Sequence, residues 1–184
     1  MYFSDKGGKH TDEVLMIAKD EAIKRGISHV IVASTKGDTG VKAAQLFEGT
    51  GTQVIVVTHN TGFGSEGDNE LEPEKRAEIE KYGGIIYTGT MVLRGLGTAI
   101  RQRCGNFSHE QIVAMTLRMF GEGVKVCIEM TAMAADAGLT PFGDIIAVAG
   151  TARGADTCVL LRANSSNKFF DIKVREILAK PAVC

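Results

Sequence analysis

The chain has no tryptophan, only three prolines among 184 residues, and no long apolar run. No stretch approaches the roughly 18 apolar residues that a membrane-spanning helix requires. Residues 1–9 contain no apolar segment of the kind that marks a signal peptide. These absences predict a soluble, cytoplasmic protein with no membrane partner.

An excess of charge of either sign is also missing. The chain has 21 Lys and Arg residues against 22 Asp and Glu residues, and its formal net charge is -1. A nucleic-acid-binding surface usually needs a cluster of positive charge, and the sequence contains no block of Lys and Arg. We therefore expect no nucleic-acid partner, and any anion-binding site must be local.

Cysteines are few and far apart, at Cys104, Cys127, Cys158 and Cys184. They form no C-x-x-C pair, and no histidine stands near them at a spacing typical of metal ligands. The four histidines of the chain are dispersed as well. The sequence thus predicts reduced thiols, no disulfide framework and no metal site.

Alternating helix and strand patterns dominate what is present. Apolar residues at helical spacing, with matching start and stop signals, predict helices over 11–25, 41–47, 74–82 and 108–138, the last with a break at 121–123. β-branched and apolar runs predict strands over 29–34, 53–58, 84–88 and 144–150. Residues 155–163 and 169–178 resemble two further strands around a turn-rich stretch, which suggests an antiparallel hairpin.

This order predicts a single α/β domain over residues 1–184, because near-continuous apolar strands alternate with helices. The architecture expected is a three-layer sandwich, in which a mainly parallel sheet carries helices on both faces. In such sheets ligands bind beyond the carboxyl ends of the strands, where the strand order reverses.

Two loops at such strand ends combine glycines, hydroxyl groups and one cation each. They are "STKGDTG" at 34–40, with Lys36, and "GTARGADT" at 150–157, with Arg153. Glycine allows close backbone approach, and hydroxyls, amides and a cation favour a phosphate. The alternatives are ordinary ones: helix capping by Ser34, Thr35 and Asp38 for the first loop, and a plain turn for the second. Neither loop has the spacing of a P-loop or a dinucleotide fingerprint.

A third loop, "HNTGFGSEGDNELEP" at 59–73, is longer than a connection requires. It is interpreted either as a binding loop, in which Phe63 covers a planar ligand, or as a surface loop without a role. His59 is either a general base or a hydrogen-bonded structural residue. No catalytic group is assigned on this basis.

The long helical segment offers weaker signals. Glu129 and Asp136 lie seven residues apart, a spacing more typical of a solvated helix face than of paired catalytic carboxylates. Four methionines at helical spacing, Met115, Met119, Met130 and Met133, are more typical of core packing than of a cofactor site. The apolar face of residues 112–120 is either core or a surface between copies, and a homo-oligomer is the interpretation we favour.

The segment "HVIVASTKGDTGVKAAQLFEGTGTQVIVVTH" resembles the carboxyl-terminal domain of pyruvate kinase, without the catalytic barrel of that enzyme. The whole chain is similar to the small stand-alone pyruvate-kinase-C-terminal-like proteins of archaea and bacteria. The stretches "ASTKGDTG" and "AGTARGADT" carry the likeness most strongly.

The resemblance implies a five-stranded sheet of order 3-2-1-4-5 with an antiparallel last strand, which would place strands 30–34 and 144–149 side by side. In pyruvate kinase the loop matching Thr35 to Thr39 holds a phosphate of a sugar bisphosphate effector. Stand-alone relatives are associated with bound flavin mononucleotide (FMN). Asp38 stands where a basic residue is common in pyruvate kinase, so a monophosphate suits this loop better than a bisphosphate.

Carried over residue by residue, the resemblance implies a phosphate site and a ring site. The residues implied are Ser34, Thr35, Lys36, Gly37, Thr39, Gly150, Thr151, Ala152 and Gly154 for the phosphate, and His59, Gly62, Phe63, Thr88 and Gly89 for the ring. The leading hypothesis is a small-molecule phosphate-binding protein with FMN as its cofactor. A regulatory module for a sugar or nucleotide phosphate and a flavin-dependent oxidoreductase are the alternatives.

Overall fold

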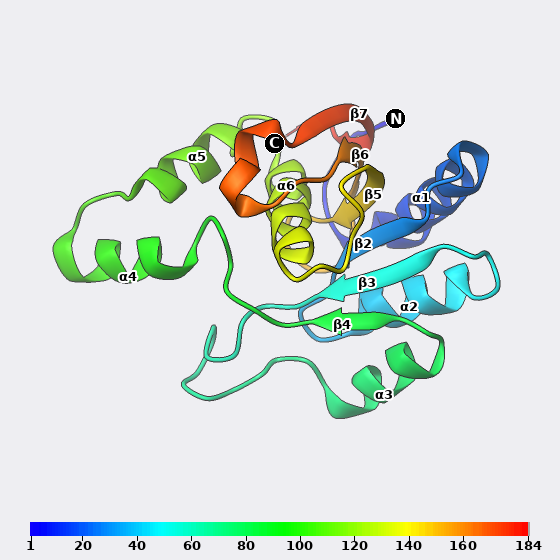
Figure 1. Ribbon diagram of the computed structural model, residues 1–184, viewed down its shortest axis with the longest axis horizontal. Coiled ribbons are helices and arrows are strands. Elements are labelled where there is room, and N and C mark those ends of the chain that lie inside the picture. Colours follow the sequence, from blue (N-terminus) through cyan, green and yellow to red (C-terminus); the bar gives the residue numbers. More distant parts are fainter. Residues whose placement is uncertain (184) are drawn as a thin grey trace.

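The sheet is the element on which the rest of the structure is built. The computed structural model describes residues 1–183, and Figure 1 shows their arrangement. Its strands are β1 (Tyr2–Phe3), β2 (His29–Ala33), β3 (Gln53–Val57), β4 (Ile85–Tyr87), β5 (Asp144–Ala149), β6 (Thr157–Arg162) and β7 (Lys173–Pro181). The helices are α1 (Thr11–Arg25), α2 (Asp38–Phe47), α3 (Pro73–Lys81), α4 (Gly95–Cys104), α5 (His109–Arg118) and α6 (Glu122–Asp136), with short 3-10 turns η1 (Gly8–His10) and η2 (Ser166–Asp171).

Within residues 1–183 the sheet has seven strands in the order β1-β7-β6-β5-β2-β3-β4. Strand β2 pairs in parallel with both β3 and β5, and β6 pairs antiparallel with β5. The α/β class is confirmed, and the stretch β4-β3-β2-β5-β6 follows the expected 3-2-1-4-5 order. The expected count of five strands is wrong, because β7 pairs beside β6 and β1 beside β7. A two-residue strand such as β1 is too short to produce any sequence period.

Alternate side chains of each strand enter two separate cores, as the pleat of a strand requires. Val30 and Val32 of β2 face one core with α1, α2 and Ile79 of α3, whereas Ile31 faces the other with α6. The predicted covering of both sheet faces by helices is therefore confirmed. Buried strands of this kind explain why their sequences are nearly continuous in apolar residues.

The predicted helices are present with shifted ends. Helix α1 covers residues 11–25 as expected, while α2 begins at Asp38, three residues before the predicted start at Val41. The Ser108 cap is confirmed. The Ser108 hydroxyl accepts a hydrogen bond from the Gln111 N–H, and the Gln111 side-chain oxygen accepts one from the Ser108 N–H. Helix α4 was not predicted, since "GLGTAIRQRC" contains two glycines and little apolar periodicity.

Two expectations about the long helical segment are wrong. Glu129 is 1% exposed and lies in the core, not on a solvated face. Met130 and Met133 are buried as predicted, but Met115 and Met119 of the α5 region are exposed. Helices α4 and α5 project from the body (Figure 1), and several of their apolar side chains, among them Leu96 and Ile112, are exposed.

Across residues 1–183, every helix is too short or too polar to cross a membrane.

Candidate functional site

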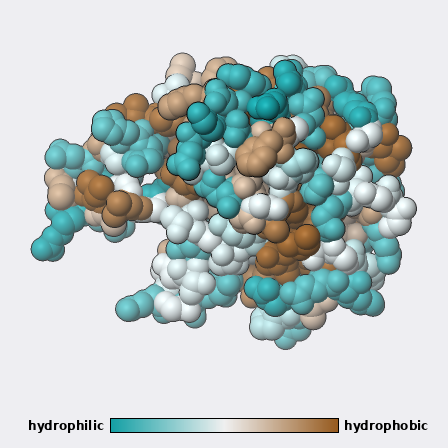
Figure 2. Space-filling model, in the orientation of Figure 1, coloured by the Kyte–Doolittle hydropathy of each residue, from teal (hydrophilic) through white to brown (hydrophobic). Residues whose placement is uncertain are grey.

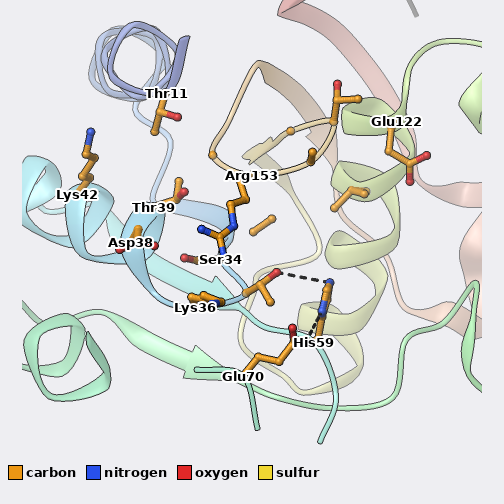
Figure 3. A pocket seen from close by; sticks show the side chains of 17 residues that line it. Thr11, Ser34, Lys36, Asp38, Thr39, Lys42, His59, Glu70, Glu122 and Arg153 are labelled. Carbon is orange, nitrogen blue, oxygen red and sulfur yellow. Dashed lines mark hydrogen bonds and ion pairs between the residues drawn. The ribbon is translucent and has the colours of Figure 1, made fainter. Parts of the chain in front are cut away.

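A cleft of about 590 Å³ opens at the carboxyl ends of β2, β3 and β5. The loops that follow β2 and β5 form two of its walls, and His59, which follows β3, lies on a third side (Figure 3). Its lining residues are Thr11, Ala33, Ser34, Thr35, Lys36, Asp38, Thr39, Lys42, His59, Glu70, Glu122, Val126, Gly150, Thr151, Ala152, Arg153 and Gly154. Pairing of β2 with β5 is what brings the two loops together.

The first wall is the turn that leads from β2 into α2. The buried Ser34 hydroxyl accepts a hydrogen bond from the Gly40 N–H at 3.0 Å, and the Ser34 N–H donates to the Val57 carbonyl at 3.0 Å. Ser34 thereby caps the first turn of the helix. The N–H groups of Asp38 and Thr39, at the start of α2, have no acceptor within the helix, so they are available to an anion.

Gly37 shapes this turn without lining the cleft. Its φ of +109° lies in a region that other residues rarely adopt, and a Cβ placed there would stand 2.4 Å from the Lys75 Cβ. Asp38 was expected to cap the helix, but Gly37 occupies the cap position. The Asp38 carboxylate instead pairs with Lys75 at 3.2 Å, which partly offsets its charge.

The second wall, residues 150–154, is held by the carboxylate of Asp156, which is completely buried. One oxygen accepts from the Thr151 N–H and hydroxyl at 3.2 and 2.7 Å and from the Gly7 N–H at 3.0 Å. The other oxygen accepts from the Thr157 hydroxyl at 2.8 Å. A buried carboxylate with four donors is satisfied, and it fixes the loop to the N-terminal segment.

The end of the second wall packs tightly against the start of α1. Gly154 has a φ of +74°, and a Cβ there would stand 2.5 Å from the Gly8 Cα and from the Thr11 hydroxyl. That hydroxyl accepts from the Ala155 N–H at 3.0 Å and donates to the Gly8 carbonyl at 2.6 Å. Only glycine allows this approach, so the shape of the wall depends on residue 154.

Two cations face the cleft without an acidic partner. Lys36 comes from the first wall and Arg153 from the second, and within residues 1–183 neither forms an ion pair. In Figure 3 the Arg153 guanidinium extends across the cleft toward Ser34 and Lys36. The Thr39 hydroxyl faces the same space and has no hydrogen bond within the described chain. This end of the cleft is therefore built for negative charge.

Apart from Glu70, which faces His59, the other Lys, Asp and Glu residues that line the cleft are paired with opposite charges. The pairs are Lys42 with Asp12 at 2.6 Å, Asp38 with Lys75 at 3.2 Å and Glu122 with Arg118 at 2.5 Å. Because these charges are compensated locally, Lys36 and Arg153 are the cations of the cleft without an acidic partner in the described chain, and the Glu70 carboxylate lies on its open side beside His59.

A histidine and a carboxylate meet at the open side of the cleft. The His59 Nδ1 lies 2.7 Å from a Glu70 carboxylate oxygen, and the His59 Nε2 lies 3.5 Å from the Thr35 hydroxyl. A carboxylate on one ring nitrogen orients the imidazole and leaves the other nitrogen for proton transfer. Both side chains are 31% exposed, so a ligand can reach them.

Phe63 stacks on His59, with ring centroids 3.8 Å apart, and the Arg94 guanidinium lies over the Phe63 ring at 4.5 Å. The 59–73 loop also closes on itself through the Gly62 N–H, which donates to the Asp68 carbonyl at 2.8 Å. The Glu72 N–H donates to the Lys36 carbonyl at 3.3 Å, so the loop is a folded structure whose end is joined to the first wall.

Nine of the residues implied by the resemblance line this one cleft, namely Ser34, Thr35, Lys36, Thr39, His59, Gly150, Thr151, Ala152 and Gly154. The other five, Gly37, Gly62, Phe63, Thr88 and Gly89, lie outside its lining. The Thr88 hydroxyl instead contacts the Thr58 hydroxyl at 2.6 Å, and Gly89 packs on the Tyr87 ring.

Sequence reasoning missed several lining residues, which are Thr11, Lys42, Glu70, Glu122 and Val126. Thr11 and Glu122 begin helices that are distant in sequence from the loops, and no local signal places them there. Glu70 was detectable in principle, because it is an acid within the same long loop as His59. The residues that the structure describes contain no group of three His, Cys, Asp or Glu side chains able to hold a metal ion.

No protein-family model matches the chain. Among solved structures, it is similar to a pyruvate kinase from Cryptosporidium parvum, with 15% identity over 87% of this chain and 24% of that chain at a TM-score of 0.45. A second structure of Cryptosporidium parvum pyruvate kinase matches at 13% identity over the same shares, with a TM-score of 0.43. An O-ureido-L-serine synthase matches at 20% identity over 53% of this chain and 30% of that chain, with a TM-score of 0.33.

The chain therefore spans between about a quarter and a third of the length of these solved proteins. Likeness at these identities and TM-scores supports no statement about activity or ligand. The function has to be argued from the cleft itself.

Proposed function

We propose that this protein binds a small phosphorylated molecule in the cleft at the carboxyl ends of β2 and β5. The observation that carries the proposal is the pair of unpartnered cations, Lys36 and Arg153, beside the first turn of α2. Free N–H groups at a helix start, a guanidinium and an ammonium together form a strong site for a phosphate.

The charge count favours a phosphate monoester. Two unpaired cations match the charge of about -2 that a monoester carries near neutral pH. A bisphosphate would require further cations, and Lys42, which also lines the cleft, is already paired with Asp12. The volume of about 590 Å³ leaves space for the organic part of the ligand beside the phosphate.

The ligand that we propose first is FMN. Its support is the resemblance of the two loops to the stand-alone relatives, together with a phosphate site that suits a monoester. The ring would extend from the phosphate toward His59 and Glu70, the open side of the cleft. Phe63 would contact it only after leaving its stack with His59.

The test is a titration of the purified protein with FMN and with riboflavin, followed by visible absorption and flavin fluorescence. We expect FMN to bind at least about 100-fold more tightly than riboflavin, because charge-assisted hydrogen bonds to the phosphate are the main contacts. Lys36→Gln and Arg153→Gln should each lower the affinity for FMN, and the double variant Thr35→Ala/Thr39→Ala should abolish FMN binding. Lys24→Gln, an exposed residue at the end of α1, is the matched control.

Each outcome separates the alternatives. FMN binding with reduction by NADH or NADPH and reoxidation by a substrate identifies an oxidoreductase. Binding of a nucleotide or sugar monophosphate in place of FMN, without turnover, identifies a regulatory module. If no phosphorylated compound binds, or if riboflavin binds as well as FMN, the proposal of a phosphate site is wrong.

A second candidate function is acid–base chemistry on the bound ligand, favoured by the Thr35–His59–Glu70 contacts. We expect any turnover of a phosphorylated compound to be lost in His59→Asn and reduced in Glu70→Gln, while its affinity is retained. Turnover that survives in His59→Asn would show that the histidine has no catalytic role.

A further inference from the structure

A second cleft, of about 460 Å³, lies between α4, α5 and α6, on the projecting part of the molecule. Four basic side chains line it: Arg94 just before α4, Arg101 on α4, Arg118 on α5 and Lys125 on α6. No Asp or Glu is among its lining residues. Four cations from separate segments around one cleft are unexpected in a chain whose formal net charge is -1.

Two of these cations are already compensated. Arg118 pairs with Glu122 at 2.5 Å, and Lys125 pairs with Glu129. Arg94 and Arg101 form no ion pair within residues 1–183. Each lies over an aromatic ring instead, Arg94 over Phe63 at 4.5 Å and Arg101 over Phe107 at 4.8 Å. The cleft therefore carries an excess of two positive charges.

The floor of the cleft is fixed by a buried ion pair. Lys125 is 3% exposed and Glu129 is 1% exposed, so both charges are removed from water. The second carboxylate oxygen of Glu129 accepts from the Leu93 N–H at 2.8 Å, which holds the segment just before α4 against α6. Buried charges are costly unless they are paired and hydrogen-bonded, as these are. The bond also fixes the backbone next to Arg94.

The cleft has an apolar side as well. Phe107 and Met115, both about half exposed, line it together with the buried Leu93 and Ala114. Figure 2 shows hydrophobic side chains on the projecting α4–α5 arm and a notch beneath it. A ligand that leaves water here can place an apolar body against these side chains and its charge on the two arginines.

We propose that this second cleft binds a small organic dianion, a phosphate monoester or a dicarboxylate with an apolar body. Guanidinium groups bind both anions through paired hydrogen bonds, and two unpaired arginines match a charge of -2. This site is distinct from the cleft between β2 and β5, because the two share no lining residue. They are neighbours, since Arg118 of the second cleft pairs with Glu122 of the first. It also differs in chemistry, since side chains alone supply the charge here.

The test uses phenyl phosphate and phthalate as probes, each with an apolar ring and a dianionic head. The full-length protein labelled with ¹⁵N is titrated with each probe up to about 10 mM, the range that detects weak binding. We expect saturable shifts of the backbone amides of Thr98, Gln102 and Gln111, which line the cleft. Arg101→Gln should weaken binding about tenfold, the usual scale for loss of a charged hydrogen bond.

Two variants serve as controls. Arg103→Gln removes an exposed arginine of the same helix that does not line the cleft, so it should leave these shifts unchanged. Lys36→Gln should weaken phosphate binding in the first cleft and leave the shifts at the second cleft unchanged, so it distinguishes the two sites. Saturation by either probe, lost in Arg101→Gln alone, supports the proposal and identifies the preferred anion. Absence of saturable shifts, or an equal loss in Arg103→Gln, would overturn it.

Discussion

Each of the two clefts of this protein has two cations without an acidic partner in the described chain, but different elements of the fold carry them. The first is formed by loops at the ends of strands, and its cations, Lys36 and Arg153, stand beside free backbone N–H groups. The second lies between helices, and its cations, Arg94 and Arg101, lie over aromatic rings. The sheet fixes the first site, whereas the packing of the projecting helices α4 and α5 fixes the second.

The difference concerns how a binding site keeps its shape. Paired strands and short turns hold the first cleft, and Asp156 joins the loop after β5 to the N-terminal segment. The arm beside the second cleft exposes large apolar side chains, among them Leu96, Ile112 and Met119, so fewer contacts hold it. We expect the first cleft to be preformed and the arm to open locally more often.

The largest effect that distinguishes the two regions is expected at the floor of the second cleft. Lys125→Met leaves the Glu129 carboxylate buried without its cation, which should lower the free energy of unfolding by about 3–5 kcal/mol. The double variant Lys125→Met/Glu129→Gln removes both charges but keeps an acceptor for the Leu93 N–H, and most of the loss should be recovered. Urea unfolding measures both values; equal losses in the two variants would contradict this account.

Breaking the wall of the first cleft should have the next largest effect. Asp156→Ala leaves four donors without their acceptor, and we expect a loss of about 3 kcal/mol together with loss of FMN binding. Asp171→Asn, at an exposed position, is the control and should change neither property. Thermal unfolding and flavin titration are the measurements. Full FMN affinity in a destabilised Asp156→Ala would show that the wall is not needed for binding.

Removal of a single cation should have a smaller effect, and comparing one cation from each cleft tests whether the clefts are separate. Arg153→Gln should weaken FMN about tenfold, whereas Arg101→Gln should leave FMN affinity unchanged. Flavin fluorescence measures both. A comparable loss in the two variants would mean that the clefts act as one site.

The mildest test needs no substitution: chemical labelling of the thiols compares the projecting helix α4 with the core. Burial raises the pKa of the Cys127 thiol and of the Cys158 thiol well above the usual range, so both remain protonated and shielded. Cys104, at the end of α4, is exposed. At pH 8, iodoacetamide should modify Cys104 rapidly and the two core cysteines only after unfolding, as peptide mass spectrometry can show. Fast labelling of Cys127 would mean that α6 opens readily.

Much of the first cleft was predictable from the sequence. The β-branched runs give buried strands, each ends in a run of small and hydroxyl residues, and parallel pairing gathers these ends at one edge. Lys36 and Arg153 were detectable because each is the one cation within its loop. Thr11 was not detectable, since its place beside Gly154 depends on tertiary packing across more than 140 residues.

The second cleft was not predictable, for a physical reason. Helix α4 has weak periodicity because it faces no sheet, and the four cations come from segments with no common motif. Glu129 was expected in solvent, since a pattern of charges cannot show that a lysine one turn earlier is buried beside it. The hairpin expected from residues 155–163 and 169–178 is confirmed as the antiparallel pair β6 and β7. The two-residue β1 was not predictable, because its pairing with β7 is set by its neighbour and not by its own residues.

The Asp156 carboxylate also bears on the order of events during synthesis. It accepts from Gly7, 149 positions earlier in the chain, so the second wall forms only after both segments exist and have packed together. Contacts of such long range close late in folding, because the loop entropy must be overcome first. A nascent chain that ends before this residue would present the first loop but no second wall. Ligand capture is therefore expected to follow completion of the fold, and the ligand would then stabilise the finished protein by mass action.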